Sequence, residues 1–362
     1  MPLIKAAVCH EFGAPLVVED VALKDPAAGE VSVALEACAI CHSDLSFIDG
    51  GWGGSLPAVY GHEAAGRITA LGAGVQGYAV GDAVLVTLIR SCGCCTPCAT
   101  GQPVQCATPY DRDAGPLRAA DGGPMQHGLA CGAFAEQAVV DQSQIARIPD
   151  DMPMDAACLL SCGVVTGMGA VVNTAQVRPG QNVVVIGAGG VGLNAVQGAA
   201  IAGAARIIAM DVLPEKLDVA REFGATDGVL VTAKKPWKEV AKITHGRMAD
   251  AVFVTVGAIP AFEQALRYLA PGGYAYIVGM PHSGAMAEYE PVILGALGQG
   301  MKGTKMGDTV LRRDIPWMVD LYQQGRLKLD ELISGRWTLD QINEAIADTR
   351  SGAARRNVIL FK

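Results

Sequence analysis

The stretch VVVIGAGGVGLNAV, residues 183–196, decides the fold. Its apolar run ends at Gly187, and Gly187, Gly189 and Gly192 then form the spacing G-x-G-x-x-G before a second apolar segment. In the order strand, turn and helix, such glycines let backbone amides approach a pyrophosphate. A second apolar run, RIIAMD, ends in Asp211, whose carboxylate is suited to bind ribose hydroxyls and to repel a 2′-phosphate. With no arginine directly after Asp211, the motif predicts a dinucleotide site that prefers NAD to NADP.

Strands and helices alternate around this motif. After a strand at 182–186, the pattern predicts these elements: a helix at 214–224, a strand at 249–257, a helix at 259–270 and a strand at 272–280. Such alternation is typical of an α/β fold with a Rossmann doubly wound parallel sheet, here over 165–300. Short valine-rich strands with glycine turns predict a second, β-rich domain over 1–164, to which 301–362 returns.

Composition excludes several classes of function. A chain of 362 residues is long enough for two domains, and a formal net charge of −8 argues against binding to nucleic acid or to an anionic membrane. The N-terminus, MPLIKAAVCHEF, has too short an apolar run for a secretory signal. The uncharged run between Arg178 and Arg206 is interrupted by glycines and amides, which favours a buried strand and helix over a membrane span. We expect a cytoplasmic protein with a small-molecule partner.

Five cysteines lie within SCGCCTPCATGQPVQC, residues 91–106. Four of them have the spacing C-x2-C-x2-C-x7-C: Cys92, Cys95, Cys98 and Cys106. In a reducing compartment such a cluster favours a metal over disulfides, and four thiolates form a closed, structural zinc site. Two alternatives to zinc fit the spacing less well. An iron–sulfur site usually places its fourth cysteine three residues after the third and follows it with a proline, and a redox-active disulfide needs only two cysteines. Cys94 is out of register.

A second set of metal ligands is spread along the chain. Cys41 lies in AICHSDL, His62 in VYGHEAAG and Cys162 in LLSCGVVTG. Taken singly, each is more simply an inert buried cysteine or a hydrogen-bonded histidine. Together, two cysteines and one histidine are a ligand set for catalytic zinc that leaves a fourth position open. Asp44 is placed to orient His62, and Ser43 adds a hydroxyl two residues after a ligand.

These motifs, in this order, resemble the zinc-dependent medium-chain alcohol dehydrogenases over essentially the whole chain. They are GHE at 61–63, the four-cysteine lobe, the cysteine before GVVTG, and the nucleotide fingerprint. The segments CLLSCGVVTGMGAVVNTA and GAARIIAMD look closest to the class III branch. The resemblance implies a GroES-like catalytic domain, one catalytic and one structural zinc ion per subunit, NAD, and a homodimer.

The resemblance also implies roles for single residues at the catalytic zinc. Cys41, His62 and Cys162 would hold the metal, with Glu63 behind it. Ser43 would take the proton of the alcohol and relay it outwards. Ser46 stands where the family often has a histidine at the end of this relay.

The cofactor-binding residues implied by the resemblance are His42, Thr166, Gly187, Gly189, Gly190, Val191, Gly192, Asp211, Lys216 and Arg356. His42 and Arg356 would contact the pyrophosphate. Thr166 and Val191 would press on the nicotinamide, and Lys216 would reach the adenosine ribose.

The substrate region departs from the glutathione-dependent enzymes of the family. Trp52 and Tyr110 stand where those enzymes carry an acidic residue and an arginine, and Arg112 is close but out of register. We expect Trp52, Leu88 and Tyr110 to line an apolar pocket that accepts aromatic groups, the alternative being that Trp52 only packs in a loop. Lys305 is either a solvated lysine or a contact for an anionic substrate.

The sequence therefore predicts an NAD-dependent zinc alcohol dehydrogenase, which interconverts a primary or secondary alcohol, aromatic and hydrophobic ones included, and an aldehyde or ketone. Three alternatives stay open. They are a glutathione-dependent formaldehyde dehydrogenase, that is, an S-(hydroxymethyl)glutathione dehydrogenase; a zinc-free quinone or enoyl reductase; and a catalytically inactive dinucleotide-binding protein.

Overall fold

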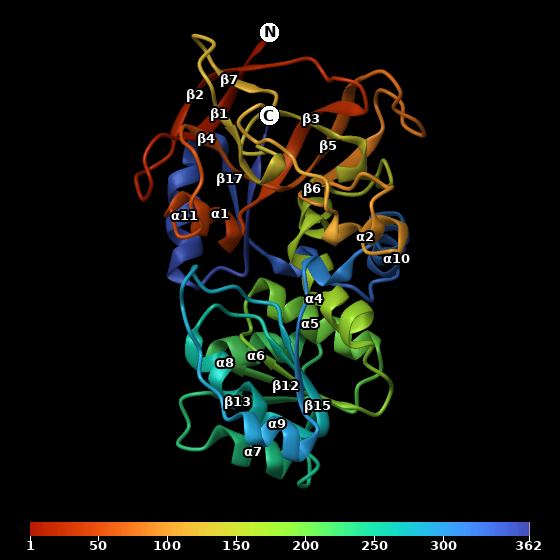
Figure 1. Ribbon diagram of the computed structural model, residues 1–362, viewed down its shortest axis with the longest axis vertical. Coiled ribbons are helices and arrows are strands. Elements are labelled where there is room, and N and C mark those ends of the chain that lie inside the picture. Colours follow the sequence, from red (N-terminus) through yellow and green to blue (C-terminus); the bar gives the residue numbers. More distant parts are fainter. Residues whose placement is uncertain (362) are drawn as a thin grey trace. The chain divides into compact units, whose positions relative to one another are not determined.

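The computed structural model describes residues 1–361, which form two compact units (Figure 1). One unit contains residues 1–163 and 310–361, and the other contains 164–309. The predicted return of the chain at residue 301 was too early, because it falls inside strand β16 (Gly300–Gly303). This strand pairs with β15 (Leu269–Ile277), so residues up to 309 stay with the second unit.

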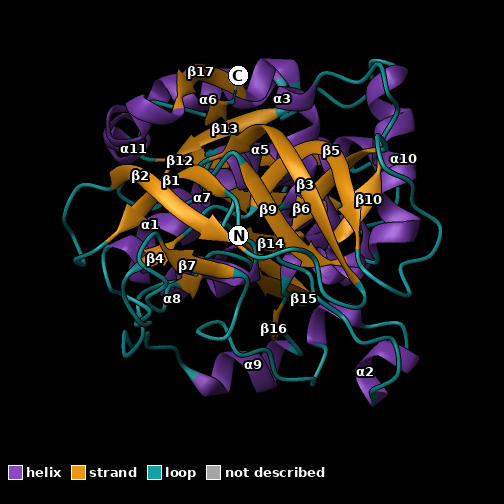
Figure 2. Ribbon diagram, turned by 90° about the horizontal axis from the view of Figure 1, so that it is seen from above, coloured by secondary structure: helices purple, strands orange, loops and turns teal. Residues whose placement is uncertain are grey.

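The first unit is built on two β-sheets. Its strands are β1 (Leu3–Cys9), β2 (Val17–Leu23), β3 (Glu30–Ala39), β4 (Ala58–Val59), β5 (Glu63–Leu71), β6 (Ala83–Thr87), β7 (Leu117–Ala119), β8 (Gln126–His127), β9 (Gln137–Asp141), β10 (Ile145–Arg147), β17 (Ile333–Thr338) and β18 (Arg356–Leu360). One sheet has the order β7-β2-β1-β4-β8, and the other has the order β10-β6-β5-β3-β18-β17, with β9 paired to β3. Figure 2 shows β3, β5 and β6 side by side in the second of these sheets.

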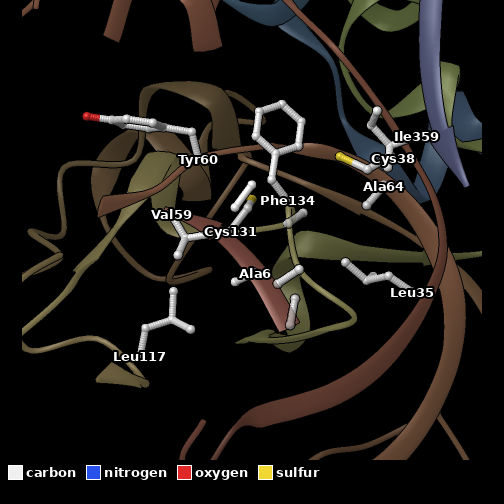
Figure 3. Packing of buried hydrophobic residues seen from close by; sticks show 14 of the residues in the cluster. Ala6, Leu35, Cys38, Val59, Tyr60, Ala64, Leu117, Cys131, Phe134 and Ile359 are labelled. Atoms are coloured by element: carbon white, nitrogen blue, oxygen red, sulfur yellow. The ribbon is translucent and has the colours of Figure 1, made fainter. Parts of the chain in front are cut away.

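Side chains from both sheets of this unit meet in one core, part of which Figure 3 shows. Phe134, Tyr60 and Leu117 are among its fully buried members. Burying a side chain of this size stabilises the fold by about 1.5–3 kcal/mol. The helices of the unit are α1 (His42–Ile48), α2 (Thr96–Ala99), α3 (Met154–Ala157), α10 (Leu311–Gln323) and α11 (Ile342–Ser351).

The second unit confirms the predicted Rossmann sheet, with six parallel strands in the order β13-β12-β11-β14-β15-β16. The remaining strands are β11 (Asn182–Ile186), β12 (Arg206–Asp211), β13 (Asp227–Leu230) and β14 (Ala249–Val254). The helices are α4 (Gly163–Gly169, whose first residue belongs to the other unit), α5 (Gly190–Ile201), α6 (Pro214–Glu222), α7 (Pro236–Ile243), α8 (Ile259–Ala265) and α9 (Pro291–Leu297). Each of α5 to α9 packs against a strand that it follows or precedes in the chain.

The predicted elements of the second unit differ from the observed ones mainly at their ends. The strand predicted at 249–257 stops at Val254, and the helix predicted at 259–270 stops at Ala265. β15 begins at Leu269, three residues before the predicted start at 272, because its first residue already pairs with Ala249 of β14.

Within residues 1–361, no single helix is long and apolar enough to cross a membrane. One bent pair of helical segments, Met154–Ser161 and Gly163–Ala175, reaches that length and composition only when taken together.

Candidate active site and metal centres

Four buried side chains of the first unit converge in one cluster. The ligand atoms of Cys41, His62, Glu63 and Cys162 all lie within 4.8 Å of one another. Cys41 precedes α1, and His62 directly precedes β5. Because β5 runs antiparallel to β3 with Glu63 opposite Ala39, the end of β3 brings Cys41 next to His62.

Hydrogen bonds to the neighbouring Ser161 hold Cys162 in place. The Ser161 hydroxyl donates to the Ala64 carbonyl at 3.0 Å, and the Thr87 hydroxyl donates to the Ser161 carbonyl at 2.6 Å. Strands β5 and β6 therefore fix the segment that carries Cys162, although it lies 100 residues after His62 in the chain.

Asp44 orients His62 for a metal. The carboxylate of Asp44 is fully buried and lies 2.9 Å from Nδ1 of His62, and it also accepts the N–H groups of Cys41 at 3.1 Å and Gly61 at 3.0 Å. Burial alone would lower the pKa of His62, but Asp44 and then Cys41 outweigh it and raise that pKa. Nε2 of His62 is buried and has no hydrogen-bond partner among residues 1–361. An imidazole bonded to a carboxylate through one nitrogen and unpartnered at the other is the arrangement of a zinc ligand.

The two thiols of the cluster also suit zinc. The hydrogen bond from Cys162 lowers the pKa of Cys41 well below its usual value, burial opposes this, and His62 lowers it further. The same pairing raises the pKa of Cys162. The surroundings therefore favour the thiolate form at Cys41, and zinc binds cysteine as the thiolate. The residues present fit a zinc ion held by two sulfurs and one nitrogen.

A buried ion pair lies at the edge of this cluster. Arg356, the first residue of β18, pairs through its guanidinium with the Glu63 carboxylate. Burial raises the pKa of Glu63 to about 7, although Arg356 opposes the shift. The other carboxylate oxygen of Glu63 has no hydrogen-bond partner among the described residues. The predicted contact of Arg356 with a pyrophosphate stays a prediction, and the observed partner of its guanidinium is Glu63.

Sequence reasoning missed this pair. β18 reaches Glu63 through its antiparallel pairing with β3, which places residues 293 positions apart in contact. No local pattern signals such a pairing, and the only hint was an arginine at the start of a C-terminal strand that ends in the apolar run VIL.

Each of the three predicted substrate-pocket residues contacts other side chains of the first unit. Trp52 is half-buried and meets the Phe47 ring edge-on, with 5.3 Å between the ring centroids. Leu88 packs against the core of this unit. The hydroxyl of Tyr110 lies 2.7 Å from Nδ1 of the buried His127. A substrate role for Trp52, Leu88 and Tyr110 stays a prediction.

The relay residues lie on α1. Ser43 is half-buried in the first turn of this helix, two residues after Cys41, and Ser46 is half-buried one turn later. His42, a predicted cofactor contact, is exposed at the start of the same helix.

The four regularly spaced cysteines form a second cluster in the first unit, around the short helix α2. The sulfurs of Cys92, Cys95, Cys98 and Cys106 lie within 4.8 Å of one another. Cys92 Sγ accepts the N–H of Cys95 at 3.3 Å, and Cys106 Sγ accepts the N–H of Cys92 at 3.3 Å. A hydrogen bond from Thr108, followed by backbone N–H groups, lowers the pKa of Cys92 to about 5. Four converging sulfurs with amide donors fit a closed zinc site.

The nucleotide motif of the second unit has the predicted strand–turn–helix form. Gly187 adopts φ +101° at the end of β11, and Gly189 precedes α5. A Cβ on Gly192 would lie 1.8 Å from the Gly187 carbonyl oxygen, so only glycine lets the helix approach the strand this closely. Asp211 ends β12, and its carboxylate accepts the N–H groups of Ala188 and Val212, each at 2.8 Å.

The other predicted cofactor residues of the second unit lie on three helices. Thr166 is on α4, Gly190 and Val191 begin α5, and Lys216 is in the first turn of α6, all half-buried. Helices α4 and α5 touch closely, because a Cβ on Gly167 would lie 2.4 Å from the carbonyl oxygen of Val191. Thr166 and the fingerprint loop are thereby brought near each other.

Comparisons with known proteins match both units. Residues 27–150 match the alcohol dehydrogenase GroES-like domain, and residues 190–324 match the zinc-binding dehydrogenase family. The chain is 37% identical to the NDMA-dependent alcohol dehydrogenase of Amycolatopsis methanolica, over 98% of each chain. It is 33% identical to the S-(hydroxymethyl)glutathione dehydrogenase of Paracoccus denitrificans, over 99% of each chain. Among solved structures, benzyl alcohol dehydrogenase from Acinetobacter calcoaceticus matches with a TM-score of 0.93 and 31% identity over 100% of each chain.

Proposed function

The chain belongs to the zinc-dependent alcohol dehydrogenase family, and from this premise we propose that it uses NAD to oxidise primary or secondary alcohols reversibly, aromatic and hydrophobic ones included. The observation that carries the proposal is the buried cluster of Cys41, His62 and Cys162, in which His62 Nε2 has no partner among the described residues. Three donors leave one zinc coordination position for an alcohol oxygen.

Each side chain around the cluster has a separate role in the proposed reaction. Zinc, when bound, supplies a Lewis acid for the alcohol oxygen, and NAD accepts the hydride. Ser43, in the first turn after Cys41, accepts the hydroxyl proton of the alcohol. Asp44 accepts the Nδ1–H of His62 and keeps Nε2 directed at the metal position. Arg356 offsets the charge of Glu63 beside the two thiols.

We assign NAD and two zinc ions per subunit as cofactors. Asp211 at the end of β12 supports NAD, because a carboxylate at this position disfavours a 2′-phosphate. The separate clusters around His62 and around α2 support one catalytic and one structural zinc ion. Metal analysis of the purified protein tests the number, and a comparison of kcat/KM with NAD and with NADP tests the nucleotide.

Two substrate classes compete within this family: uncharged alcohols, and the adduct of formaldehyde with glutathione. The lack of an acidic residue at Trp52 and of an arginine at Tyr110 favours an uncharged alcohol, and the similarity to benzyl alcohol dehydrogenase supports an aromatic one. The similarity to S-(hydroxymethyl)glutathione dehydrogenase supports the alternative, oxidation of the adduct of formaldehyde and glutathione. A screen of aliphatic, benzylic and formaldehyde substrates with and without glutathione, followed by NADH absorbance, decides between them. A strict requirement for glutathione would overturn the aromatic-alcohol proposal.

A dinucleotide-binding protein without turnover is the remaining alternative. Cys162→Ser removes one predicted zinc ligand from the first unit and leaves the fingerprint loop of the second unit unchanged. We expect this variant to lose turnover while it still binds NADH by fluorescence titration. An unchanged rate would show that the cluster does not carry the reaction.

We propose a homodimer as the functional assembly. β16 is an edge strand of the six-stranded sheet and carries the exposed Met301, and the neighbouring β15 carries the exposed Tyr274 opposite Gly300. Exposed edges with apolar side chains tend to pair with another strand, and a second copy of this chain offers the same edge. Sedimentation velocity tests the assembly, and Met301→Lys should shift it towards the monomer.

The cytoplasm is the compartment that we propose. None of the eleven cysteines forms a disulfide, and the exposed Cys92 and Cys94 would be prone to oxidation outside a reducing compartment. Fractionation of the source cells tests this assignment.

A further inference from the structure

Cys94 is the one cysteine of the α2 lobe that is not a member of the four-sulfur cluster. Its sulfur lies 3.6 Å from that of Cys92, and these two are the only exposed cysteines among the eleven. The other cysteines outside the two clusters are buried: Cys9, Cys38, Cys131 and Cys158. A dissolved oxidant therefore reaches the sulfurs of Cys92 and Cys94 more readily than any other thiol pair of the chain.

The residue between the two cysteines is a glycine with open space beside its Cα. Gly93 has φ +75°, and no atom lies within 4 Å of the position that a Cβ would occupy. A disulfide needs a sulfur–sulfur distance of about 2.05 Å, so the observed 3.6 Å has to shorten by roughly 1.5 Å. The change requires rotation about the side-chain bonds of Cys92 and Cys94, and the open space beside Gly93 leaves room for an accompanying adjustment of the backbone.

We propose that Cys94 is an oxidative modification site through which a peroxide opens the four-cysteine centre. The inference rests on the structural zinc ion of the proposed function. The peroxide oxidises the Cys94 thiol to a sulfenic acid and is reduced to water. The Cys92 thiolate then attacks the sulfenic sulfur, the Cys92–Cys94 bond forms, and hydroxide leaves.

Disulfide formation removes one of the four zinc ligands. Cys95, Cys98 and Cys106 then hold the ion with three sulfurs instead of four, and zinc is released. A thiol reductant cleaves the disulfide, and added zinc restores the centre. The lobe is thereby a reversible sensor of oxidant, and it responds through a residue that the metal itself does not need.

The experiment follows zinc release and disulfide formation instead of activity. The fully reduced wild type is first analysed for zinc, then treated with dilute hydrogen peroxide in the presence of a chromogenic zinc chelator. Peptide mass spectrometry after differential alkylation identifies the cysteines that pair. Cys94→Ser is the test variant, and Cys9→Ser, which changes a buried cysteine outside both clusters, is the matched control.

We expect the wild type and Cys9→Ser to release one zinc ion together with a Cys92–Cys94 disulfide. Cys94→Ser should contain the same amount of zinc when reduced and release it at least about tenfold more slowly, because the most accessible thiol is gone. Release from Cys94→Ser at the wild-type rate, or a disulfide between other cysteines, would overturn this inference alone. A reduced wild type that lacks the second zinc ion would overturn the structural zinc of the proposed function as well.

Discussion

Replacing Asp44 by asparagine tests whether the carboxylate behind His62 holds the catalytic metal. The substitution keeps the volume of the side chain but removes its charge and one of its two acceptor oxygens. The wild-type carboxylate receives three N–H groups, from His62, Gly61 and Cys41, at 2.9, 3.0 and 3.1 Å. If the asparagine oxygen keeps the bonds to His62 and Gly61, its NH2 group faces the buried N–H of Cys41.

The expected size of the effect follows from these contacts. Leaving one buried N–H without an acceptor costs about 1–3 kcal/mol. Loss of the partner that orients a metal-bound histidine typically weakens metal binding by about 10–100-fold. A factor of ten is about 1.4 kcal/mol, so the two magnitudes agree. We therefore expect Asp44→Asn to bind its catalytic zinc about 10–100-fold more weakly and to keep its structural zinc.

The assay is a chelator titration with mass-spectrometric counting of zinc per subunit after dialysis. Asp82→Asn is the matched control, because this carboxylate also accepts a backbone N–H, from Ala79, and pairs with Arg147 at the surface, without contact to a zinc ligand. The control should keep both ions at every chelator concentration that the wild type tolerates. If Asp44→Asn retains both ions equally well, the carboxylate does not support the metal and the reasoning fails.

Three further predictions concern turnover, stability and pH. Ser43→Ala should lower kcat by about 10²-fold or more through loss of the proton acceptor, with zinc content unchanged, and Ser43→Thr should recover part of it; equal rates would exclude the relay. Arg356→Met should reduce the free energy of unfolding by about 3–5 kcal/mol in denaturant titrations, because Glu63 is left buried without its partner. The double variant with Glu63→Gln should regain much of that loss, and no recovery would contradict the pairing. Burial lowers the pKa of His127 from 6.5 to about 4, so the unfolded chain binds the extra proton between these values. Stability should accordingly fall as the pH drops from about 6.5 to 4, by about 3 kcal/mol in total. His127→Gln should flatten this dependence, and an unaltered slope would assign it to other groups.

The parts of the molecule that the sequence predicts well are those encoded locally. The spacing of Cys92, Cys95, Cys98 and Cys106 alone predicts a common site, because short two-residue gaps restrict how far apart the sulfurs can lie. The strand before Gly187 and the helix after it follow from hydrophobic pattern and glycine geometry. Cys41, His62 and Cys162 lie far apart in sequence, so their residue types and the family resemblance suggested a common zinc site, but no local spacing predicted that they meet.

The parts that sequence reasoning missed depend on pairings between distant segments. Glu63 contacts Arg356 because β18 pairs with β3 in the same sheet. Tyr110 contacts His127 because a loop folds back on the short strand β8. Element ends were also misplaced, as at β15, because strand pairing and not local preference decides where a strand starts.

The pairing of Glu63 with Arg356 also sets an order of events during synthesis of the chain. A ribosome that has produced Glu63 must add 293 more residues before Arg356 exists. At about 5–20 residues per second this delay is roughly 15–60 s, and the whole dinucleotide-binding unit is made within it. Until then the nascent chain carries Cys41 and His62 next to a Glu63 carboxylate that has no arginine partner. The first unit therefore cannot complete its folding before residues 164–309 have been translated.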